Sequence, residues 1–175
     1  MTQSFIFAKR PEGFDNHIDQ SIRGYSDLID DVLKLSEYFV EDDTNVVDVG
    51  CSTGKMLKTM VDQNTFAKRV NYIGVELEEN FVSGWDEYIG KVPALSFLHQ
   101  DIRDYDFQNC SFVSSIFTLL FMPQHERSLV IRRIYNGLQY GGAFVFSEKT
   151  LADSAKIQDI RTFIYYDHKR KSFTE

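Results

Sequence analysis

The stretch Val47-Asp48-Val49-Gly50-Cys51-Ser52-Thr53-Gly54-Lys55 decides the fold predicted for this chain. A short β-branched strand runs into a tight turn at Gly50, and a helix opens near Gly54. Glycine is needed in such a turn because a side chain would strain the backbone or block a ligand. We expect the N–H groups of the turn and of the helix start to face a ligand above the strand. In an open parallel sheet, ligands bind at this carboxyl edge.

Strands and helices alternate along the rest of the chain. Strands are predicted at 45–49, 70–75, 94–98, 112–119 and 143–146, and helices at 25–39, 54–63, 80–89, 124–138 and 151–166. This rhythm is typical of βαβ units, and it predicts an α/β fold with a five-stranded parallel sheet and helices on both faces. The length fits a single domain over 1–175. Pro11, Gly13 and Asp15 interrupt any helical period, so 1–20 are predicted to form an irregular N-terminal arm.

Composition and charge exclude several classes of function. The formal net charge of -7 disfavours nucleic-acid binding without a partner, because an acidic surface repels phosphates. No stretch approaches the roughly 18 apolar residues of a membrane-spanning helix. The two cysteines, Cys51 and Cys110, form no disulfide framework, which predicts a reducing, cytoplasmic location. The four histidines are scattered and lack the spacing of metal ligands, so no metal site is expected.

The glycine turn reads G-x-S-x-G, a spacing that other sites share. The nucleophile elbow of α/β-hydrolases has the same letters, but it also needs an acid and a histidine later in the chain. None of His99, His125 and His168 is expected in a suitable turn after a strand. The dinucleotide fingerprint G-x-G-x-x-G and the phosphate-binding loop G-x-x-x-x-G-K-[ST] have different spacings. The rest of the sequence must therefore decide what binds here.

Two further acids favour a nucleoside at this edge of the sheet. Glu76 ends the second predicted strand, where a carboxylate accepts hydrogen bonds from both ribose hydroxyls of a nucleoside. Asp101 follows the third strand, where its side chain or the neighbouring backbone meets the adenine amino group. Asp48, Gly50, Glu76 and Asp101, in this order, match the arrangement of class I methyltransferases that bind S-adenosylmethionine.

Several sequence blocks resemble one particular family, the carboxy-S-adenosylmethionine synthases of tRNA wobble-uridine modification. These blocks are Gly24-Tyr25-Ser26, Asp48-Val49-Gly50-Cys51-Ser52, Asp101-Ile102-Arg103-Asp104, Phe117-Thr118-Leu119, Ile134-Tyr135-Asn136-Gly137-Leu138, Gly141-Gly142-Ala143, Ser147-Glu148-Lys149 and Asp167-His168-Lys169-Arg170. The resemblance implies a Rossmann-like class I methyltransferase fold, with S-adenosylmethionine or carboxy-S-adenosylmethionine as cofactor. The enzymes of this family transfer a carboxyl group from prephenate to the methyl group of S-adenosylmethionine through a sulfonium ylide.

Matching positions in the family also imply which residues contact the ligand. Tyr25 would contact it from the N-terminal helix, the turn would line its methionine part, Glu76 would hold the ribose, and Asp101 with Ile102 the adenine. The full set of cofactor-binding residues is Tyr25, Asp48, Gly50, Cys51, Ser52, Gly54, Glu76, Leu77, Asp101, Ile102 and Ile116. Taken singly, Tyr25 also suits a core aromatic residue, and Cys51 and Ile102 suit small or apolar core positions. No catalytic residue is implied.

The sequence departs from the family pattern at two places. Ile116 stands where the family has Asn at the end of the fourth strand, and Leu120 replaces a nearby Gln. The family continues past the position of Glu175 with an arginine that holds the carboxylate of the carboxylated ligand, and then with the last two strands of the sheet. We therefore expect those two strands to be lacking here. The candidate substitutes for the arginine are Lys149, Arg170 and a partner subunit.

An unpaired, apolar flank beyond the fifth strand would recruit a partner, so a homodimer or a larger assembly is expected. Two functions stay open. The first is an S-adenosylmethionine-dependent transferase, which needs no catalytic triad because the sulfonium is already activated and the protein mainly aligns donor and acceptor. The second is a catalytically degenerate protein that binds the same nucleoside and serves as a structural, assembly or regulatory component.

Overall fold

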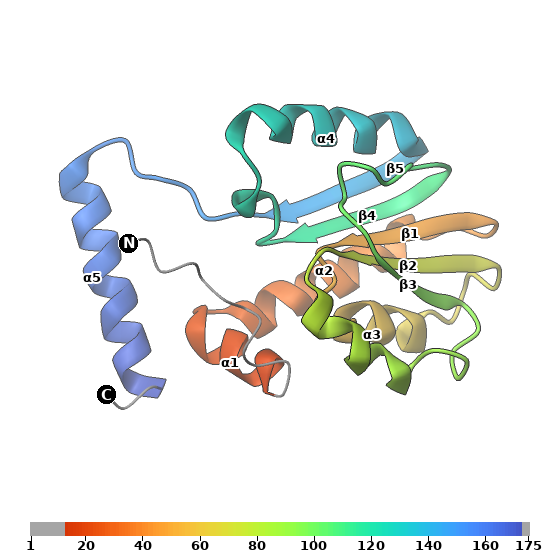
Figure 1. Ribbon diagram of the computed structural model, residues 1–175, viewed down its shortest axis with the longest axis horizontal. Coiled ribbons are helices and arrows are strands. Elements are labelled where there is room, and N and C mark those ends of the chain that lie inside the picture. Colours follow the sequence, from red (N-terminus) through yellow and green to blue (C-terminus); the bar gives the residue numbers. More distant parts are fainter. Residues whose placement is uncertain (1–12, 173–175) are drawn as a thin grey trace.

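The computed structural model describes residues 13–172, and one sheet of five parallel strands lies at its centre (Figure 1). The strands are β1 (Thr44–Val49), β2 (Val70–Glu76), β3 (Leu95–His99), β4 (Cys110–Ile116) and β5 (Leu138–Ser147). Their order is β3-β2-β1-β4-β5, so the strand order reverses beside β1. The predicted five-stranded parallel sheet is confirmed. Ligands of such sheets bind at the carboxyl ends of the strands where the order reverses, which is where β1 ends.

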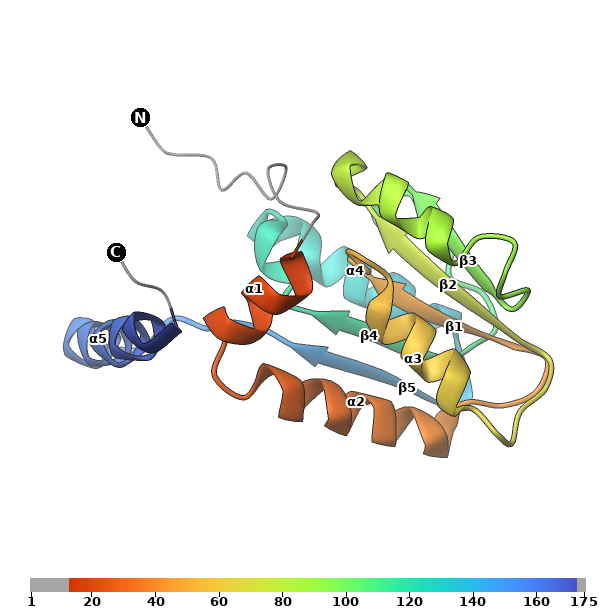
Figure 2. The same cartoon turned by 90° about the horizontal axis from the view of Figure 1, so that it is seen from below.

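Helices cover both faces of this sheet. The helices are α1 (Phe14–Ser21), α2 (Tyr25–Phe39), α3 (Lys55–Gln63), the 3-10 helices η2 (Glu79–Glu87) and η3 (Leu119–Phe121), α4 (Gln124–Gly137) and α5 (Ala155–Ser172). Figures 1 and 2 show α2 and α3 on one face and α4 on the other. Helix α5 stands away from the sheet at the end of an extended linker and contacts α1. No helix of residues 13–172 is long and apolar enough to cross a membrane.

The core consists of one apolar layer on each face of the sheet. Successive residues of a strand point to opposite faces. Val46 of β1 therefore packs with Leu57 of α3 on one side. Its neighbour Val47 packs with Ile134 of α4 on the other. All four side chains are fully buried, and burial of each contributes about 1.5–3 kcal/mol to folding. The buried valines of β1 thus hold the turn that follows it in a fixed place.

The prediction of an irregular arm is wrong for residues 14–20, which belong to helix α1 (Phe14–Ser21). Gly13 does not break this helix but precedes it, in a left-handed conformation with φ 80°. Phe14 packs edge-on against Phe81 of η2, with 4.9 Å between the ring centroids. This contact joins residues far apart in the sequence, so no local period reveals it. The first twelve residues of the predicted arm lie outside the described residues.

Other element boundaries differ from the predictions for local reasons. The fourth strand ends at Ile116 because the next residue, Phe117, has a positive φ of 56°. The fifth strand begins earlier, at Leu138, and bulges around Gly141, whose φ is 86°. The segment predicted as a helix at 80–89 is the 3-10 helix η2. The last helix runs from Ala155 to Ser172, later than predicted at both ends.

Candidate functional site

The turn after β1 admits only glycine at its first position. Gly50 has φ 75°, and a Cβ added there would lie 2.2 Å from Oγ1 of Thr118. Gly54, with φ 78°, precedes α3, and a Cβ there would lie 2.4 Å from the ring of Phe97. Both glycines are therefore required twice over, by backbone conformation and by the close approach of a neighbour.

The N–H groups of the turn are used inside the protein, contrary to the expectation that they face a ligand. Gly50 and Cys51 both donate to the carbonyl oxygen of Val75, at 2.8 and 3.3 Å, and Gly54 donates to the carbonyl oxygen of Cys51 at 2.8 Å. Ser52 donates to a carboxylate oxygen of Glu76 at 3.0 Å. The turn follows β1 so closely that its amides extend the pairing with β2. It therefore offers a ligand few backbone donors.

The carboxylate of Glu76 points toward the turn. Its Oε2 accepts the Ser52 N–H bond, and its Oε1 accepts a bond from the backbone N–H of Glu78 at 2.8 Å. A carboxylate has about four acceptor sites, so two of them stay available to hydroxyl donors. The two bonds fix the orientation of Glu76 at the carboxyl end of β2, directly beside the turn.

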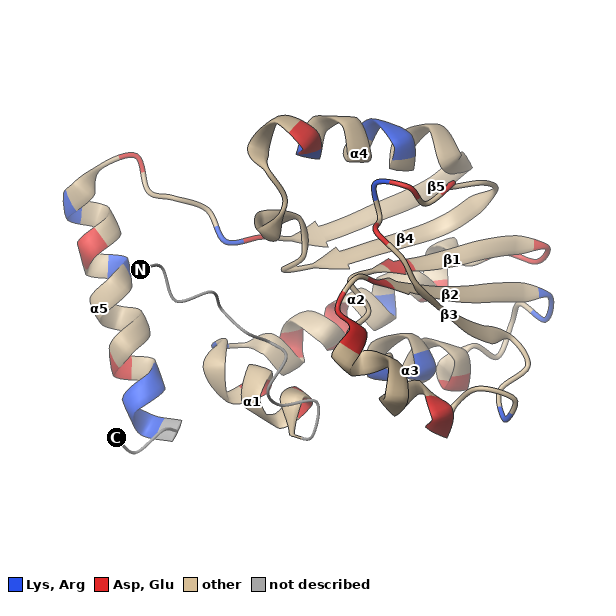
Figure 3. Ribbon diagram, in the orientation of Figure 1, with Lys and Arg blue, Asp and Glu red and all other residues tan. Residues whose placement is uncertain are grey.

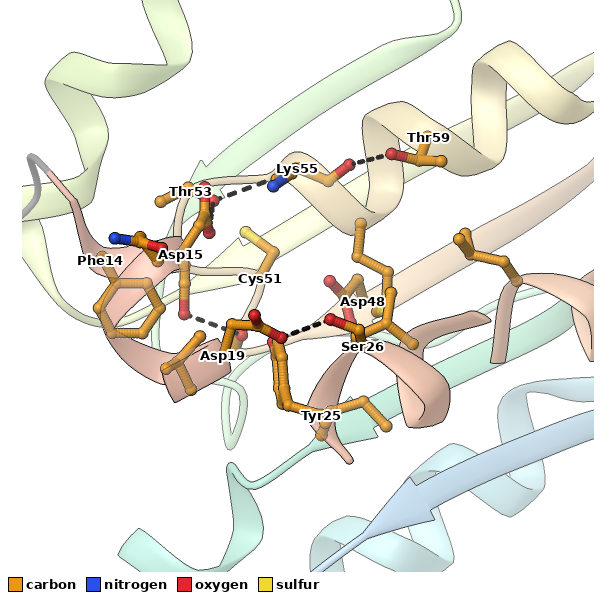
Figure 4. Close-up of a pocket in the computed structure, with 18 of the residues that line it drawn as sticks. Phe14, Asp15, Asp19, Tyr25, Ser26, Asp48, Cys51, Thr53, Lys55 and Thr59 are labelled. Atoms are coloured by element: carbon orange, nitrogen blue, oxygen red, sulfur yellow. Dashed lines mark hydrogen bonds between the residues drawn. The ribbon is translucent and has the colours of Figure 1, made fainter. Parts of the chain in front are cut away.

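A cavity of about 570 Å³ opens on the side of the turn that faces α1 and α2 (Figure 4). Six of the predicted site residues line it: Tyr25, Asp48, Gly50, Cys51, Ser52 and Ile116. They come from α2, the end of β1, the turn and the end of β4. A volume of this size lies within the range of small-molecule sites. The structure therefore brings these six together around one hollow.

The other five predicted residues do not line this cavity. Glu76 reaches the turn from β2, and Gly54 lies under the ring of Phe97. Leu77 is exposed, while Ile102 is packed in the core with Val49 and Val75.

Asp101 stands apart from the turn in its interactions. It is paired with Arg103, which also contacts Glu126. The Arg103 guanidinium holds the pKa of Asp101 below its usual value. None of the hydrogen bonds between described residues joins Asp101 to the turn. The two halves of the predicted site are thus the cavity beside β1 and the strand ends of β2 and β3.

Asp48 is a buried carboxylate at the base of the cavity. Only 3% of its surface is exposed, and its Oδ1 accepts a bond from the Ser114 hydroxyl at 2.8 Å. Burial, opposed by that bond and reinforced by the negative charge of Glu76, raises the pKa of Asp48 to about 7. Asp48 therefore gains or loses its proton near neutral pH. A charged ligand in the cavity would shift this protonation equilibrium.

This pKa predicts how the Asp48→Asn variant will behave. In the unfolded chain Asp48 loses its proton near its ordinary pKa, whereas the folded protein keeps it up to about pH 7. Between these values folding favours the protonated group, so its contribution to stability is lost as the pH rises toward 7. Urea unfolding at pH 5 and pH 8 should therefore show Asn gaining on Asp with rising pH, by on the order of a few kcal/mol. Parallel pH dependences would contradict the assignment.

Tyr25 and Cys51 are held in their neutral forms. Burial and the nearby carboxylates of Asp48, Asp15 and Asp19 raise the pKa of the Tyr25 phenol far above its ordinary value. Burial likewise raises the pKa of the Cys51 thiol, with Asp48 and Glu76 adding to the effect. The neutral phenol can therefore donate a hydrogen bond, and the buried thiol packs as a small apolar group rather than as a nucleophile.

Acids on α1 belong to the cavity but are absent from the predicted site. Asp15 accepts a hydrogen bond from the Thr53 hydroxyl of the turn at 2.9 Å, and Asp19 accepts one from Ser26. Both acids line the cavity. Sequence reasoning misses both acids because it predicts an irregular arm over residues 1–20. Asp15 and Asp19 stand four residues apart, which puts them on one face of a helix, and this spacing is the signal that could have found them.

Glu148, in the Ser-Glu-Lys block, holds the loop that closes over the turn. Its two carboxylate oxygens accept bonds from the backbone N–H groups of Leu119 and Leu120, at 2.7 and 3.0 Å. This loop carries Phe117, whose ring stacks on Tyr25 with 6.5 Å between centroids. It also carries Thr118, which abuts Gly50. Glu148 thus connects the end of β5 to the wall of the cavity.

Neither of the cations considered for holding a carboxylate lines the cavity. Lys149 lies over the ring of Tyr165, 5.5 Å from its centroid. Arg170 pairs with Asp167 at 3.0 Å on α5. Within residues 13–172, no group of three or more His, Cys, Asp or Glu side chains is placed to hold a metal ion.

Comparison with known proteins relates this geometry to one family. The family described as "Methyltransferase domain" matches residues 46–142. The chain is 34% identical over 158 residues to the carboxy-S-adenosyl-L-methionine synthase of Staphylococcus epidermidis, covering 89% of this chain and 67% of the relative. It is 34% identical over 173 residues to the synthase of Colwellia psychrerythraea, covering 96% of this chain and 70% of that protein. The chain therefore spans about two thirds of the length of these relatives.

Solved structures give the same fold. An amino pentose methyltransferase from Micromonospora echinaspora, solved with S-adenosylmethionine bound, superposes with a TM-score of 0.62 at 19% identity. The superposition covers 80% of this chain and 57% of that one. At this identity the likeness concerns the fold alone.

Proposed function

The chain belongs to the methyltransferase-domain family and is related to the carboxy-S-adenosyl-L-methionine synthases, and from this premise we propose that it is a transferase that uses S-adenosylmethionine and acts on a small molecule. The observation that carries the proposal is the pairing of Glu76 with the glycine turn, where the Glu76 carboxylate accepts the Ser52 N–H bond at 3.0 Å. The donor would lie across this point. Its ribose would bind Glu76, and its methionine part would enter the cavity beside Asp48.

The adenine end of the donor would lie over the ends of β2 and β3. Leu77 follows the end of β2 and is exposed, and Asp101 lies in the loop after β3. Ile102 would contact the adenine only at its edge, because its side chain is largely buried in the core. On this placement, the eleven residues predicted from the sequence form one continuous path from α2 to the loop after β3.

The chemistry of methyl transfer places few demands on side chains. The sulfonium already makes the methyl carbon electrophilic, so the protein has to align the acceptor in line with the carbon–sulfur bond and exclude water. The acceptor space would be formed by Tyr25, Ile116 and the loop that Glu148 holds. The stacking of Phe117 on Tyr25 gives that space a rigid aromatic wall.

The alternative, a degenerate nucleoside-binding protein with a structural or regulatory role, is not favoured. The relatives at 34% identity are named as synthases, and their similarity spans 89% or more of this chain. Carboxy-S-adenosylmethionine is the second candidate for the bound nucleoside, on the strength of the same relatives.

Two measurements test the proposed function. Mass spectrometry of the purified protein after denaturation should detect S-adenosylmethionine, S-adenosylhomocysteine or the carboxylated nucleoside. Incubation with methyl-labelled S-adenosylmethionine and a panel of small-molecule acceptors should transfer the label. Absence of any nucleoside, together with no transfer to any acceptor, would overturn the proposal.

We further propose that the chain forms a homodimer in the cytoplasm. Among the described residues β5 pairs only with β4, and Phe146 and Tyr140 on it are exposed. Helix α5 exposes a series of apolar side chains: Ile157, Ile160, Phe163, Ile164, Tyr165 and Tyr166. Figure 3 shows basic residues gathered at the C-terminal end of α5. Their positive charges stabilise this helix because they interact favourably with the negative end of its dipole.

A second copy of the chain would cover these two apolar surfaces. The proposed location in the cytoplasm is supported by the two cysteines, which are both free, as is usual in a reducing compartment. Light scattering during size-exclusion chromatography should give twice the chain mass. A stable monomer would contradict the dimer.

A further inference from the structure

The loop after β4, residues 117–122, is held at both ends by charged side chains of other elements. It contains η3, a 3-10 helix of three residues, which is too short to be stable by itself. At its start, the two carboxylate oxygens of Glu148 accept bonds from the first two N–H groups of η3. At its end, the guanidinium of Arg127 donates to the carbonyl oxygens of Leu120 and Met122, at 3.0 Å each. The shape of the loop therefore depends on Glu148 and Arg127.

The backbone at the start of this loop is strained. Phe117 has φ 56°, in the left-handed region that a residue with a side chain seldom adopts. Such a conformation persists only where its surroundings fix it. The N–H group of Phe117 donates to the carbonyl oxygen of Ser147 at 2.8 Å, and the residue after Ser147 is Glu148. The end of β5 thus fixes the start of the loop through two successive residues.

The loop rests on the glycine turn and on the phenol of the cavity. The Thr118 side chain packs so closely over Gly50 that an added Cβ would lie 2.2 Å from its Oγ1. The ring of Phe117 stacks on that of Tyr25, with 6.5 Å between the centroids. Both Gly50 and Tyr25 line the cavity. Glu148 is not among the described residues that line it, so any effect of Glu148 on a bound molecule would pass through these two contacts.

The carboxylate of Glu148 is partly shielded from water. Burial raises the pKa of this carboxyl, although the bonds from the N–H groups of the loop and the charge of Arg127 oppose the rise. Hydrogen bonds to an ionised group are about twice as strong as those between neutral groups, and they are costly to lose away from water. Loss of this charge would therefore remove the main hold on the start of η3.

We propose that Glu148 is a positioning residue of this transferase, which sets the affinity for S-adenosylmethionine by seating the loop 117–122 on Gly50 and Tyr25. This inference rests on the proposed function and adds a residue to its site. The loop has two arrangements, seated on the turn or displaced from it, and the turn keeps the shape that the donor needs only while the loop is seated. The apparent affinity for the donor then falls with the fraction of the protein that has a seated loop.

Replacement of Glu148 by glutamine tests the proposal. Glutamine has the same length, but it carries no charge and offers one acceptor oxygen to the two N–H groups. We expect Glu148→Gln to bind S-adenosylmethionine about tenfold more weakly in titration calorimetry, the effect of losing one hydrogen bond to a charged group. Arg127→Gln loosens the other end of the loop and should weaken binding in the same direction. It takes the place of Glu148→Gln if circular dichroism shows that the latter does not fold.

Asp42→Asn is the matched control. The Asp42 carboxylate accepts N–H bonds from two successive residues, Lys68 and Arg69, and pairs with the Arg69 guanidinium. It therefore makes the same kinds of contact as Glu148, but it does so before β1 and β2, at the amino edge of the sheet. Asp42→Asn should bind S-adenosylmethionine like the wild type.

A second background tests the path from Glu148 to the turn. Thr118→Ala removes the closest atoms over Gly50 and leaves Glu148 and its backbone bonds in place. In this background Glu148→Gln should weaken binding by only about threefold, because the effects of residues that act through one contact are not additive. A purely structural role of Glu148 would give the same loss in both backgrounds.

Hydrogen exchange followed by NMR gives a readout that needs no ligand. Glu148→Gln should speed up exchange of the Leu119 N–H, which loses its acceptor. It should also speed up exchange of the Gly50 N–H, which is bonded to Val75, because a displaced loop no longer holds the turn. We expect an increase of about tenfold at Gly50, equal to the loss of affinity, and no increase in Asp42→Asn.

The outcomes separate this inference from the proposed function. If the wild type and Glu148→Gln bind S-adenosylmethionine equally, or if the loss is as large in the Thr118→Ala background, the inference is overturned and the proposed function stands. If the wild type does not bind the nucleoside, the proposed function falls, and exchange at Gly50 decides the rest. Faster exchange in Glu148→Gln would then support the seating of the loop by Glu148, and unchanged exchange would overturn it.

Discussion

Replacement of Gly50 by alanine should abolish measurable binding of S-adenosylmethionine and lower the free energy of unfolding by about 2–5 kcal/mol. The left-handed backbone at φ 75° costs a side chain about 1–2 kcal/mol. The new methyl group would also lie 2.2 Å from Oγ1 of Thr118, and relieving such overpacking costs about 1–3 kcal/mol more. Either the turn, which lines the cavity, or the loop at Thr118 must move. Urea unfolding and titration calorimetry measure the two effects.

Gly90→Ala is the matched control for this variant. Gly90 has nearly the same φ, 76°, but nothing lies within 4 Å of an added Cβ. It should therefore lose only the backbone contribution, about 1–2 kcal/mol, and keep its affinity for the nucleoside.

A second substitution, Thr118→Ala, removes the two atoms nearest to the added methyl group in Gly50→Ala. It should recover part of the lost stability. Equal losses for Gly50→Ala and Gly90→Ala would show that contact with Thr118 does not constrain the turn.

Replacement of Glu76 by glutamine should weaken S-adenosylmethionine binding by about 10- to 100-fold. The carboxylate already accepts the N–H bonds of Ser52 and Glu78, and under the proposed function its remaining acceptor sites bind both ribose hydroxyls. A glutamine amide has one acceptor oxygen and would turn its NH₂ group toward one of these donors. Hydrogen bonds to a charged group contribute about 1.5–3 kcal/mol each, which sets the expected loss. Titration calorimetry gives the dissociation constants.

Glu79→Gln provides the control for charge. Glu79 lies three residues further along the chain, is exposed, and changes the net charge by the same amount. It should bind the donor like the wild type. Comparable weakening in both variants would mean that long-range charge, rather than contact with Glu76, determines the affinity.

Most of the sheet could be predicted from the sequence because its central strands are short, β-branched and buried on both faces. Val46 and Val47 are both fully buried, toward opposite helical layers, so the run carries a strong signal. Elements fixed by distant contacts were less predictable. Helix α1 depends on the packing of Phe14 against Phe81, and the end of β4 depends on the positive φ of Phe117. Neither feature leaves a local period in the sequence.

The candidate site was predictable to a similar degree. Tyr25, Asp48 and Ile116 come from three separate segments, and the structure brings them to the cavity as expected, although their roles in binding stay predictions. The orientation of the turn amides was not predictable. It follows from the register of β1 against β2, which places the carbonyl oxygen of Val75 under Gly50. The acids of α1 were missed together with their helix.

The proposed function depends most directly on whether the glycine turn and Glu76 bind the sulfonium nucleoside. Calorimetric titration of the purified chain with S-adenosylmethionine measures this binding and needs no knowledge of the acceptor. We predict one site per chain with a dissociation constant between about 1 μM and 1 mM, the usual range for enzymes and their substrates. The absence of heat and of thermal stabilisation at millimolar nucleoside would contradict it.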